Sequence, residues 1–315
     1  MTGRFAPGSW AVILGGSSGF GLATARALAE HGMNLCLVHW DRRTLLAAIE
    51  PEFEKLRGIG VQVQSFNTDA LAAAKRDSVL DQLALALGEA GRVRVLLHSI
   101  AFGNLKLLAP EAPAEHGAAR TLAAKLGVEE ERVQAAIDDL FAEGFVEAHA
   151  LASPPTYSDR HFLGEKDFSR TIHAMGTSLL GWVQGIFERK LFDDDARVFG
   201  LTSEGNEVVW KGYAAVAAAK AALESLARSI AIEYAPYGIR CNIVQAGISE
   251  TPALAAIPGS EHLKAQARLR NPFNRLTTPR DVANVIYLLS TDEAAWINGT
   301  VVRVDGGEHI SGVTQ

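Results

Sequence analysis

Cysteine is nearly absent from this chain, as are long apolar runs and any excess of positive charge. The two cysteines, Cys36 and Cys241, each lie inside an apolar stretch, so we expect buried, reduced thiols and no disulfide framework. The N-terminus has no signal-peptide core, and no apolar segment is long enough to cross a membrane. These absences predict a cytoplasmic protein without a membrane partner. The net charge of −6 excludes a general nucleic-acid binder, and no metal site is predicted.

The composition that remains is that of an ordinary globular protein. Hydrophobic residues make up 48% and charged residues 21% of the 315 positions, which suits a large buried core. A chain of this length forms either one big domain or one domain with an insertion.

A glycine-rich segment near the N-terminus carries the first functional signal. Residues 10–14 are apolar and uncharged, which predicts a strand buried on both faces. Residues 22–31 have helical spacing and end at Gly32, and residues 34–39 predict a second strand. Glycines between strand and helix let the backbone approach a pyrophosphate, while the helix N-terminus supplies N–H groups. The sequence therefore predicts half of a dinucleotide-binding fold, with contacts from Gly15, Ser17, Ser18, Gly19, Phe20 and Gly21.

The spacing Gly15-x3-Gly19-x-Gly21 resembles the cofactor loop of the short-chain dehydrogenase/reductase superfamily. Five later segments resemble that family in the same order: 67–69, 93–101, 199–203, 239–251 and 299–307. The resemblance covers roughly residues 8–103 and 166–312. It implies an α/β fold, with a Rossmann-like doubly wound parallel sheet in a single domain over residues 1–315. It also implies cofactor contacts from Asp69, Ser99, Ile100, Ala101, Lys220, Gly247, Ile248 and Thr251.

The end of the second predicted strand is where cofactor selection is expected. The chain there reads Val38-His39-Trp40-Asp41-Arg42-Arg43. An acidic residue at this place accepts hydrogen bonds from the ribose 2′-hydroxyl of NAD, whereas an arginine accommodates the 2′-phosphate of NADP. Because His39 stands where the family's NAD enzymes place aspartate, we expect NADP(H), bound near Trp40 and Arg42. Asp41 argues the other way and leaves NAD(H) open.

Tyr213 and Lys220 are the candidate catalytic pair. Seven residues along a helix make two turns, so both side chains are expected on one face of a helix over residues 213–234. The ammonium should lower the pKa of the phenol. The phenol could then donate a hydrogen bond or a proton to an oxygen that gains negative charge. The alternative from the residues alone is a buried tyrosine and a lysine on an alanine-rich core helix.

The spacing of this pair bears on the reaction. Most of the resembled family carries Tyr-x3-Lys and reduces carbonyls or oxidises alcohols, but the residue four before Lys220 is Val216, which has no proton to donate. Tyr-x6-Lys, with residues 98–102 and Ala246-Gly247, resembles the enoyl-thioester reductase branch, which reduces the C=C bond of enoyl-acyl-carrier-protein or enoyl-CoA. There the oxyanion forms away from the carbon that receives hydride. A donor about 5 Å farther along the helix axis is better placed for it.

The resemblance implies that Tyr213 stabilises the enolate and that Lys220 contacts the nicotinamide ribose. Ser203 lies thirteen residues before Val216, which is the spacing of the serine in the carbonyl-reducing family. Enoyl reductases usually carry an aromatic residue near this place. Ser203 is thus a candidate for binding the thioester oxygen, or it only ends a strand. It leaves open a carbonyl or alcohol oxidoreductase, such as a 3-ketoacyl thioester reductase, and a non-catalytic dinucleotide-binding sensor is a third hypothesis.

Residues 104–165 form an insertion of about sixty residues, far longer than usual connections. Residues 121–126 and 129–141 predict two helices around Gly127, and residues 153–156 predict a loop. The segment is similar to a helix-turn-helix unit. Between Glu115 and Glu147, however, eight acidic residues face only three basic ones, and phosphates would be repelled. We expect a helical packing domain or lid, and no nucleic-acid partner.

The segment after Thr251 is the expected substrate side. Residues 252–258 are apolar, which suits an acyl chain. The cations Lys264, Arg268, Arg270 and Arg275 could meet the phosphates of CoA or an acidic carrier protein, although a salt-bridged surface explains them equally well. The resemblance implies an acyl thioester partner, linked to a carrier protein or to CoA. From the alanine-rich helix 213–234 it also implies a homo-oligomer, a tetramer or a dimer.

Overall fold

Seven parallel strands form the central sheet in the computed structural model, which describes residues 4–111, 117–158 and 161–312. They lie in the order β3-β2-β1-β4-β5-β6-β7. Strands β2 and β3 therefore follow on one side of β1, and β4 to β7 follow on the other side. This is the doubly wound arrangement expected from the sequence. The strands are β1 (Ser9–Leu14), β2 (Asn34–His39), β3 (Val63–Asn67), β4 (Arg92–His98), β5 (Phe192–Ser203), β6 (Ile239–Ala246) and β7 (Val301–Val304).

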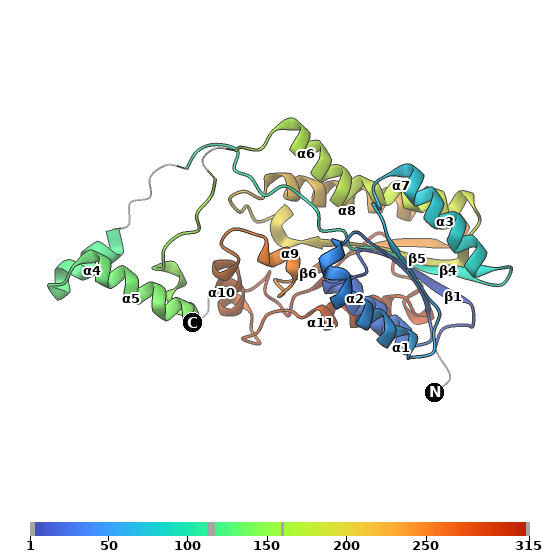
Figure 1. Ribbon diagram of the computed structural model, residues 1–315, viewed down its shortest axis with the longest axis horizontal. Helices are drawn as coiled ribbons and strands as arrows, with labels where there is room; N and C mark the ends of the chain where they lie inside the picture. The colour runs from blue at the N-terminus through green and yellow to red at the C-terminus, as the bar shows by residue number, and fades with distance from the viewer. Residues whose placement is uncertain (1–3, 112–116, 159–160, 313–315) are drawn as a thin grey trace.

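Helices cover both faces of this sheet (Figure 1). On one face lie α1 (Gly19–Glu30), α2 (Arg43–Arg57) and α11 (Pro279–Leu289). On the other lie α3 (Ala73–Leu87), α6 (Glu165–Ile172), α7 (Ser178–Glu188) and α8 (Ala214–Glu233), with a π-helical turn, His173–Thr177, between α6 and α7. The remaining helices are α4 (Gly117–Leu126), α5 (Glu130–Ala142), α9 (Pro252–Ala255) and α10 (Ser260–Arg270).

Two apolar cores result from the alternation of side chains along the buried strands. In β1, Trp10, Val12 and Leu14 belong to the core beneath α3, α7 and α8. Ala11 and Ile13 belong to the core beneath α1, α2 and α11. The uncharged run at residues 10–14 predicts this two-sided burial, since each of its side chains needs an apolar neighbour.

Cys36 and Cys241 lie in these cores as free thiols, as predicted. Burial raises the pKa of Cys36 to about 12 and also raises the pKa of Cys241. Both thiols therefore stay protonated and unreactive. Among the described helices, none combines the length and the apolar character that crossing a membrane requires.

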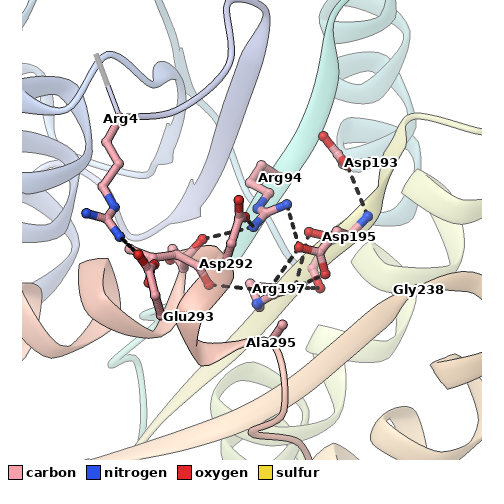
Figure 2. Close-up of polar contacts among 12 residues, drawn as sticks. Arg4, Arg94, Asp193, Asp195, Arg197, Gly238, Asp292, Glu293 and Ala295 are labelled. Atoms are coloured by element: carbon pink, nitrogen blue, oxygen red, sulfur yellow. Dashed lines mark hydrogen bonds and ion pairs between the residues drawn. The ribbon is translucent and has the colours of Figure 1, made fainter. Parts of the chain in front are cut away.

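A cluster of ion pairs lies near the amino ends of β4, β5 and β6, at the edge of the sheet opposite to the cavity described below (Figure 2). Asp195 accepts hydrogen bonds from Arg197 at 2.6 and 3.0 Å, and its Oδ2 lies 2.8 Å from Arg94 Nη1. Arg240 also pairs with Asp195. One carboxylate thus serves three guanidinium groups, of which Arg197 is fully buried.

The insertion forms the two predicted helices, α4 and α5, which lie beyond α10 at one end of the molecule (Figure 1). Val133 and Ile137 are buried in a small core of their own, whereas Leu140, on the same helix, is 45% exposed. The insertion contacts α10 through His262. Its Nδ1 lies 3.1 Å from His149 O, and its Nε2 lies 3.1 Å from Ser153 O. The insertion is therefore fixed to the helix that follows the apolar segment 252–258.

Candidate active site

A cavity of about 530 Å³ opens at the carboxyl ends of the strands, where open α/β sheets bind their ligands. Its walls come from the loops after strands β1 to β6 and from α8 and α9. Nearly all the predicted site residues line it: Gly15, Ser17, Ser18, Gly19, Phe20, Trp40, Asp69, Ser99, Ile100, Ala101, Ser203, Tyr213, Lys220, Gly247, Ile248 and Thr251. Gly21 and Arg42 are not among the lining residues.

The loop after β1 has the geometry of a phosphate cradle. Gly15 has a φ of +86°, and a Cβ there would lie 2.5 Å from Ser99 O. A Cβ on Gly21 would lie 2.1 Å from Gly15 O, so only glycine lets the first turn of α1 close against the loop. Gly21 thus shapes the loop from behind. The cavity, this cradle and the helix N-terminus together fit a dinucleotide.

Gly21→Ala is expected to weaken dinucleotide binding at least about tenfold, because the added methyl group must displace Gly15 from the cradle. Titration of the protein with NADH or NADPH, followed by nicotinamide fluorescence, measures the change. Gly164→Ala is the matched control, since a Cβ at Gly164 meets open space and its φ of −98° suits alanine. An affinity of the Gly21 variant equal to that of the control would contradict the cradle.

Tyr213 stands at the entrance to α8 as its N-cap residue, with φ −102° and ψ 0°. Its ring packs on the backbone of Gly205, where a Cβ would lie 2.4 Å from the ring, and meets Trp210 edge-on at 5.4 Å. Its Oη lies 3.3 Å from Ser203 Oγ. Burial raises the pKa of Tyr213, against the opposing effect of Ser203. The prediction that Lys220 lowers this pKa was wrong, because burial raises the pKa and the opposing effect comes from Ser203, not from Lys220.

Lys220 lies two turns later on α8 and faces the same cavity. Its Nζ donates to Leu201 O at 2.7 Å. Burial lowers the pKa of Lys220 to about 8, partly offset by Glu224, so the ammonium still prevails at neutral pH. Nearby His98 is fully buried, with Nε2 2.9 Å from Ser178 Oγ. Burial and the Lys220 charge lower the pKa of His98 to about 3, so it is neutral.

Glu224, on α8, holds the carboxyl end of β5, where Ser203 lies. Thr202 Oγ1 and Asn206 Nδ2 donate to Glu224 Oε1 at 2.6 and 2.8 Å. These bonds flank Ser203 and fix it beside Tyr213. Ser203 ends β5 and is also a hydrogen-bond partner of the candidate acid.

The carboxyl end of β2 presents Asp41, and not Arg42, to the cavity. His39 Nδ1 donates to Asp41 Oδ2 at 2.8 Å, and the Asp41 N–H donates to Asn67 Oδ1 at 2.9 Å. Arg42 is exposed and is the N-cap residue of α2. The predicted phosphate-binding arginine therefore does not line the cavity.

The remaining wall is largely apolar. Several of its members, among them Leu105, Met175 and Trp210, were not predicted, because no motif marks them, whereas Leu254 belongs to the predicted apolar segment 252–258. The cations after residue 258 do not line the cavity. Lys264 lies 2.6 Å from Glu261, Arg268 3.6 Å from Glu250, Arg270 2.6 Å from Glu204 and Arg275 2.7 Å from Asp281. The sequence leaves two interpretations of these cations open, and the ion pairs favour the salt-bridged surface.

Two family models match the chain. The model of the enoyl-(acyl carrier protein) reductase family matches residues 129–309, and the short chain dehydrogenase model matches residues 9–116. A cis-4-hydroxycyclohexanecarboxylate dehydrogenase of Sinomonas cyclohexanicum is 28% identical over 297 residues, 94% of this chain and 95% of that protein. A 1-cyclohexenylcarbonyl-CoA reductase of Streptomyces collinus is 35% identical over 120 residues, 38% of this chain and 43% of that protein.

A third relative is the enoyl-acyl-carrier-protein reductase (NADH) of Aquifex aeolicus, 40% identical over 113 residues, 36% of this chain and 42% of that protein. Among solved structures, an enoyl-acyl-carrier-protein reductase of Anaplasma phagocytophilum in complex with NAD has a TM-score of 0.70 at 19% identity, covering 100% of this chain and 96% of that one. A short-chain dehydrogenase of Burkholderia cenocepacia in complex with NADP has a TM-score of 0.68 at 20% identity, covering 96% and 98%. These structures share the fold. With the family models, they show that the chain belongs to the short-chain dehydrogenase/reductase superfamily, whose members are oxidoreductases that bind a nicotinamide dinucleotide.

Proposed function

We propose that this protein reduces the C=C bond of a 2-enoyl thioester with a nicotinamide dinucleotide as the reductant. The observation that carries the proposal is the placement of Tyr213, which lines the cavity seven residues before Lys220. Val216, at the place where carbonyl-reducing members carry their tyrosine, lines the same cavity and offers no proton. The acid is thereby set back by about one helical turn, about 5 Å. That offset suits an oxygen remote from the carbon that is reduced.

The chain's own residues have separable roles in this proposal. The dinucleotide, when bound, supplies the hydride. The loop from Gly15 to Gly19 holds its pyrophosphate through backbone N–H groups. Tyr213 Oη donates to the thioester oxygen as negative charge develops there, and Ser203 orients that hydroxyl. Lys220 supplies a positive charge beside the nicotinamide ribose. The apolar wall excludes water from the reacting carbons.

The choice between the two dinucleotides is decided at the end of β2. NADP(H), which the sequence favours, remains an untested prediction. The position of Asp41 in the cavity lining, with Arg42 outside it, supports NAD(H), since a carboxylate accepts from the ribose 2′-hydroxyl and repels a 2′-phosphate. We therefore propose NADH as the preferred reductant. The predicted homo-oligomer remains a prediction.

A second function, oxidation or reduction at a carbonyl or alcohol carbon, has one structural observation in its favour. Ser203 Oγ and Tyr213 Oη lie 3.3 Å apart, and a serine beside the acid is the arrangement of the carbonyl-reducing family. The relative that aligns with 94% of this chain is a dehydrogenase of a hydroxycyclohexane carboxylate. Two relatives, one for each reaction, act on compounds with a six-membered ring. We propose that the largely apolar cavity takes a ring-containing acyl group.

A spectrophotometric assay separates the two functions. The protein is mixed with NADH or NADPH, and 1-cyclohexenylcarbonyl-CoA, crotonyl-CoA, a 3-ketoacyl thioester or a simple ketone is added while nicotinamide absorbance is followed. The reverse direction is tested with NAD⁺ and cis-4-hydroxycyclohexanecarboxylate. We expect the enoyl thioesters to be reduced at least about tenfold faster than the ketone, a difference of about 1.4 kcal/mol in the barrier.

Turnover of the ketone or of the hydroxy acid alone would reject enoyl reduction in favour of the second function. Cofactor binding without turnover of any of these substrates would reject both in favour of a dinucleotide-binding sensor.

A further inference from the structure

Glu308 is a buried carboxyl group directly behind the loop that follows β6. Its side chain is 2% exposed, and its Oε2 has no hydrogen-bond partner among the residues that the structure describes. A Cβ on Gly247 would lie 2.9 Å from that oxygen. Gly247 and Ile248 line the cavity, whereas Glu308 does not. The carboxyl group therefore lies next to the cavity wall without being part of the lining.

The turn that ends the described chain fixes this position. Asp305 Oδ1 accepts from the Gly307 N–H at 2.9 Å, and its Oδ2 accepts from the His309 N–H at 3.1 Å. Asn271 Nδ2 donates to Asp305 O at 2.9 Å. The turn holds Glu308 beneath Gly247, so the placement is built into the fold.

The charges around Glu308 do not neutralise it. Arg270 Nη2 lies 3.9 Å from Glu308 Oε1 but only 2.6 Å from Glu204 Oε2. The guanidinium group therefore pairs mainly with Glu204. His309 faces Glu204 and Glu207, at 3.5 and 3.0 Å. Burial, with the Glu204 and Asp305 carboxylates, raises the pKa of Glu308 to about 7, against Arg270 and a hydrogen bond from the Ile248 backbone.

We propose that Glu308 is a positioning residue that acts through the Gly247–Ile248 loop to favour the oxidised, cationic nicotinamide over the reduced, neutral one. The inference rests on the proposed function, because it places the nicotinamide end of the dinucleotide at this loop, whose Gly247 and Ile248 are predicted cofactor contacts that line the same cavity as Tyr213 and Lys220. A buried carboxylate stabilises a nearby positive charge and has little effect on a neutral ring. Preferential stabilisation of the product form of the cofactor makes hydride donation more favourable on the enzyme than in water.

A dependence on pH follows from the same geometry. Glu308 is ionised above about pH 7 and protonated below it, so affinity for the oxidised dinucleotide should rise with pH through this range. Affinity for the reduced dinucleotide should change little. By linkage, binding of the oxidised form should release a proton.

The experiment compares dissociation constants of NAD⁺ and NADH, measured by calorimetry, for the parent, Glu308→Gln and the control Glu207→Gln. Glu207 belongs to the same cluster, but its side chain is 46% exposed and it does not face the loop. We expect Glu308→Gln to weaken NAD⁺ binding relative to NADH roughly three- to tenfold at about pH 8 and to remove the step near pH 7. Any step from Lys220, near pH 8, should persist in both variants.

Outcomes for the inference and for the proposed function differ. If both dinucleotides bind and the ratio of their dissociation constants in Glu308→Gln equals that of the parent at both pH values, the inference is wrong while the proposed function stands. If the parent protein itself shows no change in this ratio between about pH 6 and 8, the inference fails without reference to any variant. If neither dinucleotide binds the parent, the proposed function and this inference fail together.

Discussion

Tyr213→Phe is expected to lower kcat for enoyl-thioester reduction by about 10²–10⁴-fold, because the variant loses the group that donates to the developing oxyanion. The ring keeps its contacts with Gly205 and Trp210, and only the hydroxyl disappears. The fold and the dinucleotide affinity should therefore stay close to those of the parent. Steady-state kinetics with the preferred enoyl thioester, together with a titration of the dinucleotide, measure both quantities. A loss in kcat without a matching loss in binding identifies an interaction made in the transition state.

Tyr237→Phe is the matched control, since Tyr237 is 58% exposed and lies after α8, away from the cavity. It should retain the activity of the parent. Parent-like turnover of enoyl thioesters by Tyr213→Phe would remove the tyrosine from the mechanism. A loss confined to ketone or alcohol substrates would instead support the second function.

The fold was predictable from local patterns because each pattern has one structural solution here. An uncharged run such as residues 10–14 forms a strand that must be buried on both faces. The glycine motif that follows it requires a strand on its N-terminal side and a helix on its C-terminal side. These constraints fix β1, α1 and β2 nearly residue by residue. The largest shifts of a boundary are at helix starts, since α1 begins at Gly19 and not at residue 22, and α4 begins at Gly117 and not at residue 121. Tyr213 caps α8 from outside it, which periodicity alone does not show.

The lining of the cavity was predictable where a motif or the family resemblance marks its members. The glycine loop, Tyr213 and Lys220 belong to motifs, and the resemblance implied Ser99 and Gly247, which line the cavity from other segments. Arg42 was expected in the cavity, but whether a residue after a strand turns inward depends on the turn, and here Asp41 is held inward by His39 and Asn67. The pKa of Tyr213 was expected to fall, since proximity to an ammonium is visible in the sequence whereas depth of burial is not.

Glu308 and Asp195 were missed for a related reason. Each acquires its role from partners that lie far away in the chain. Glu308 is set against Gly247 by the packing of a terminal turn, and Asp195 gathers arginines from three strands. The sequence around a carboxylate does not indicate that residues far away in the chain will pack against it or share it.

Asp195→Asn is expected to destabilise the protein by about 3–5 kcal/mol, because it leaves three guanidinium groups, one of them fully buried, without their shared carboxylate. Arg94 also pairs with Asp292 (Figure 2) and keeps this partner in the variant. Among the described residues, Arg197 keeps only backbone oxygens as partners. The melting temperature, measured by calorimetry, should fall by roughly 6–12 °C, and urea denaturation should show the loss in the free energy of unfolding. The parameters kcat and KM should stay unchanged below that temperature, because the cluster lies at the opposite edge of the sheet from the cavity.

The control Asp292→Asn removes a carboxylate from the same cluster, 2.8 Å from Arg94 but 91% exposed, and should cost less than about 1 kcal/mol. Burial opposes the ionisation of Asp195, but the hydrogen bond from Arg197 and the three arginine charges outweigh it and lower its pKa. A group with a lowered folded-state pKa stabilises the fold above its ordinary pKa and loses that effect as the pH falls. The gap in stability between the parent and Asp195→Asn should therefore be full at neutral pH and shrink below about pH 4. Equal losses for the two variants at neutral pH, or a gap that widens in acid, would show that Asp195 does not hold the three arginines in place.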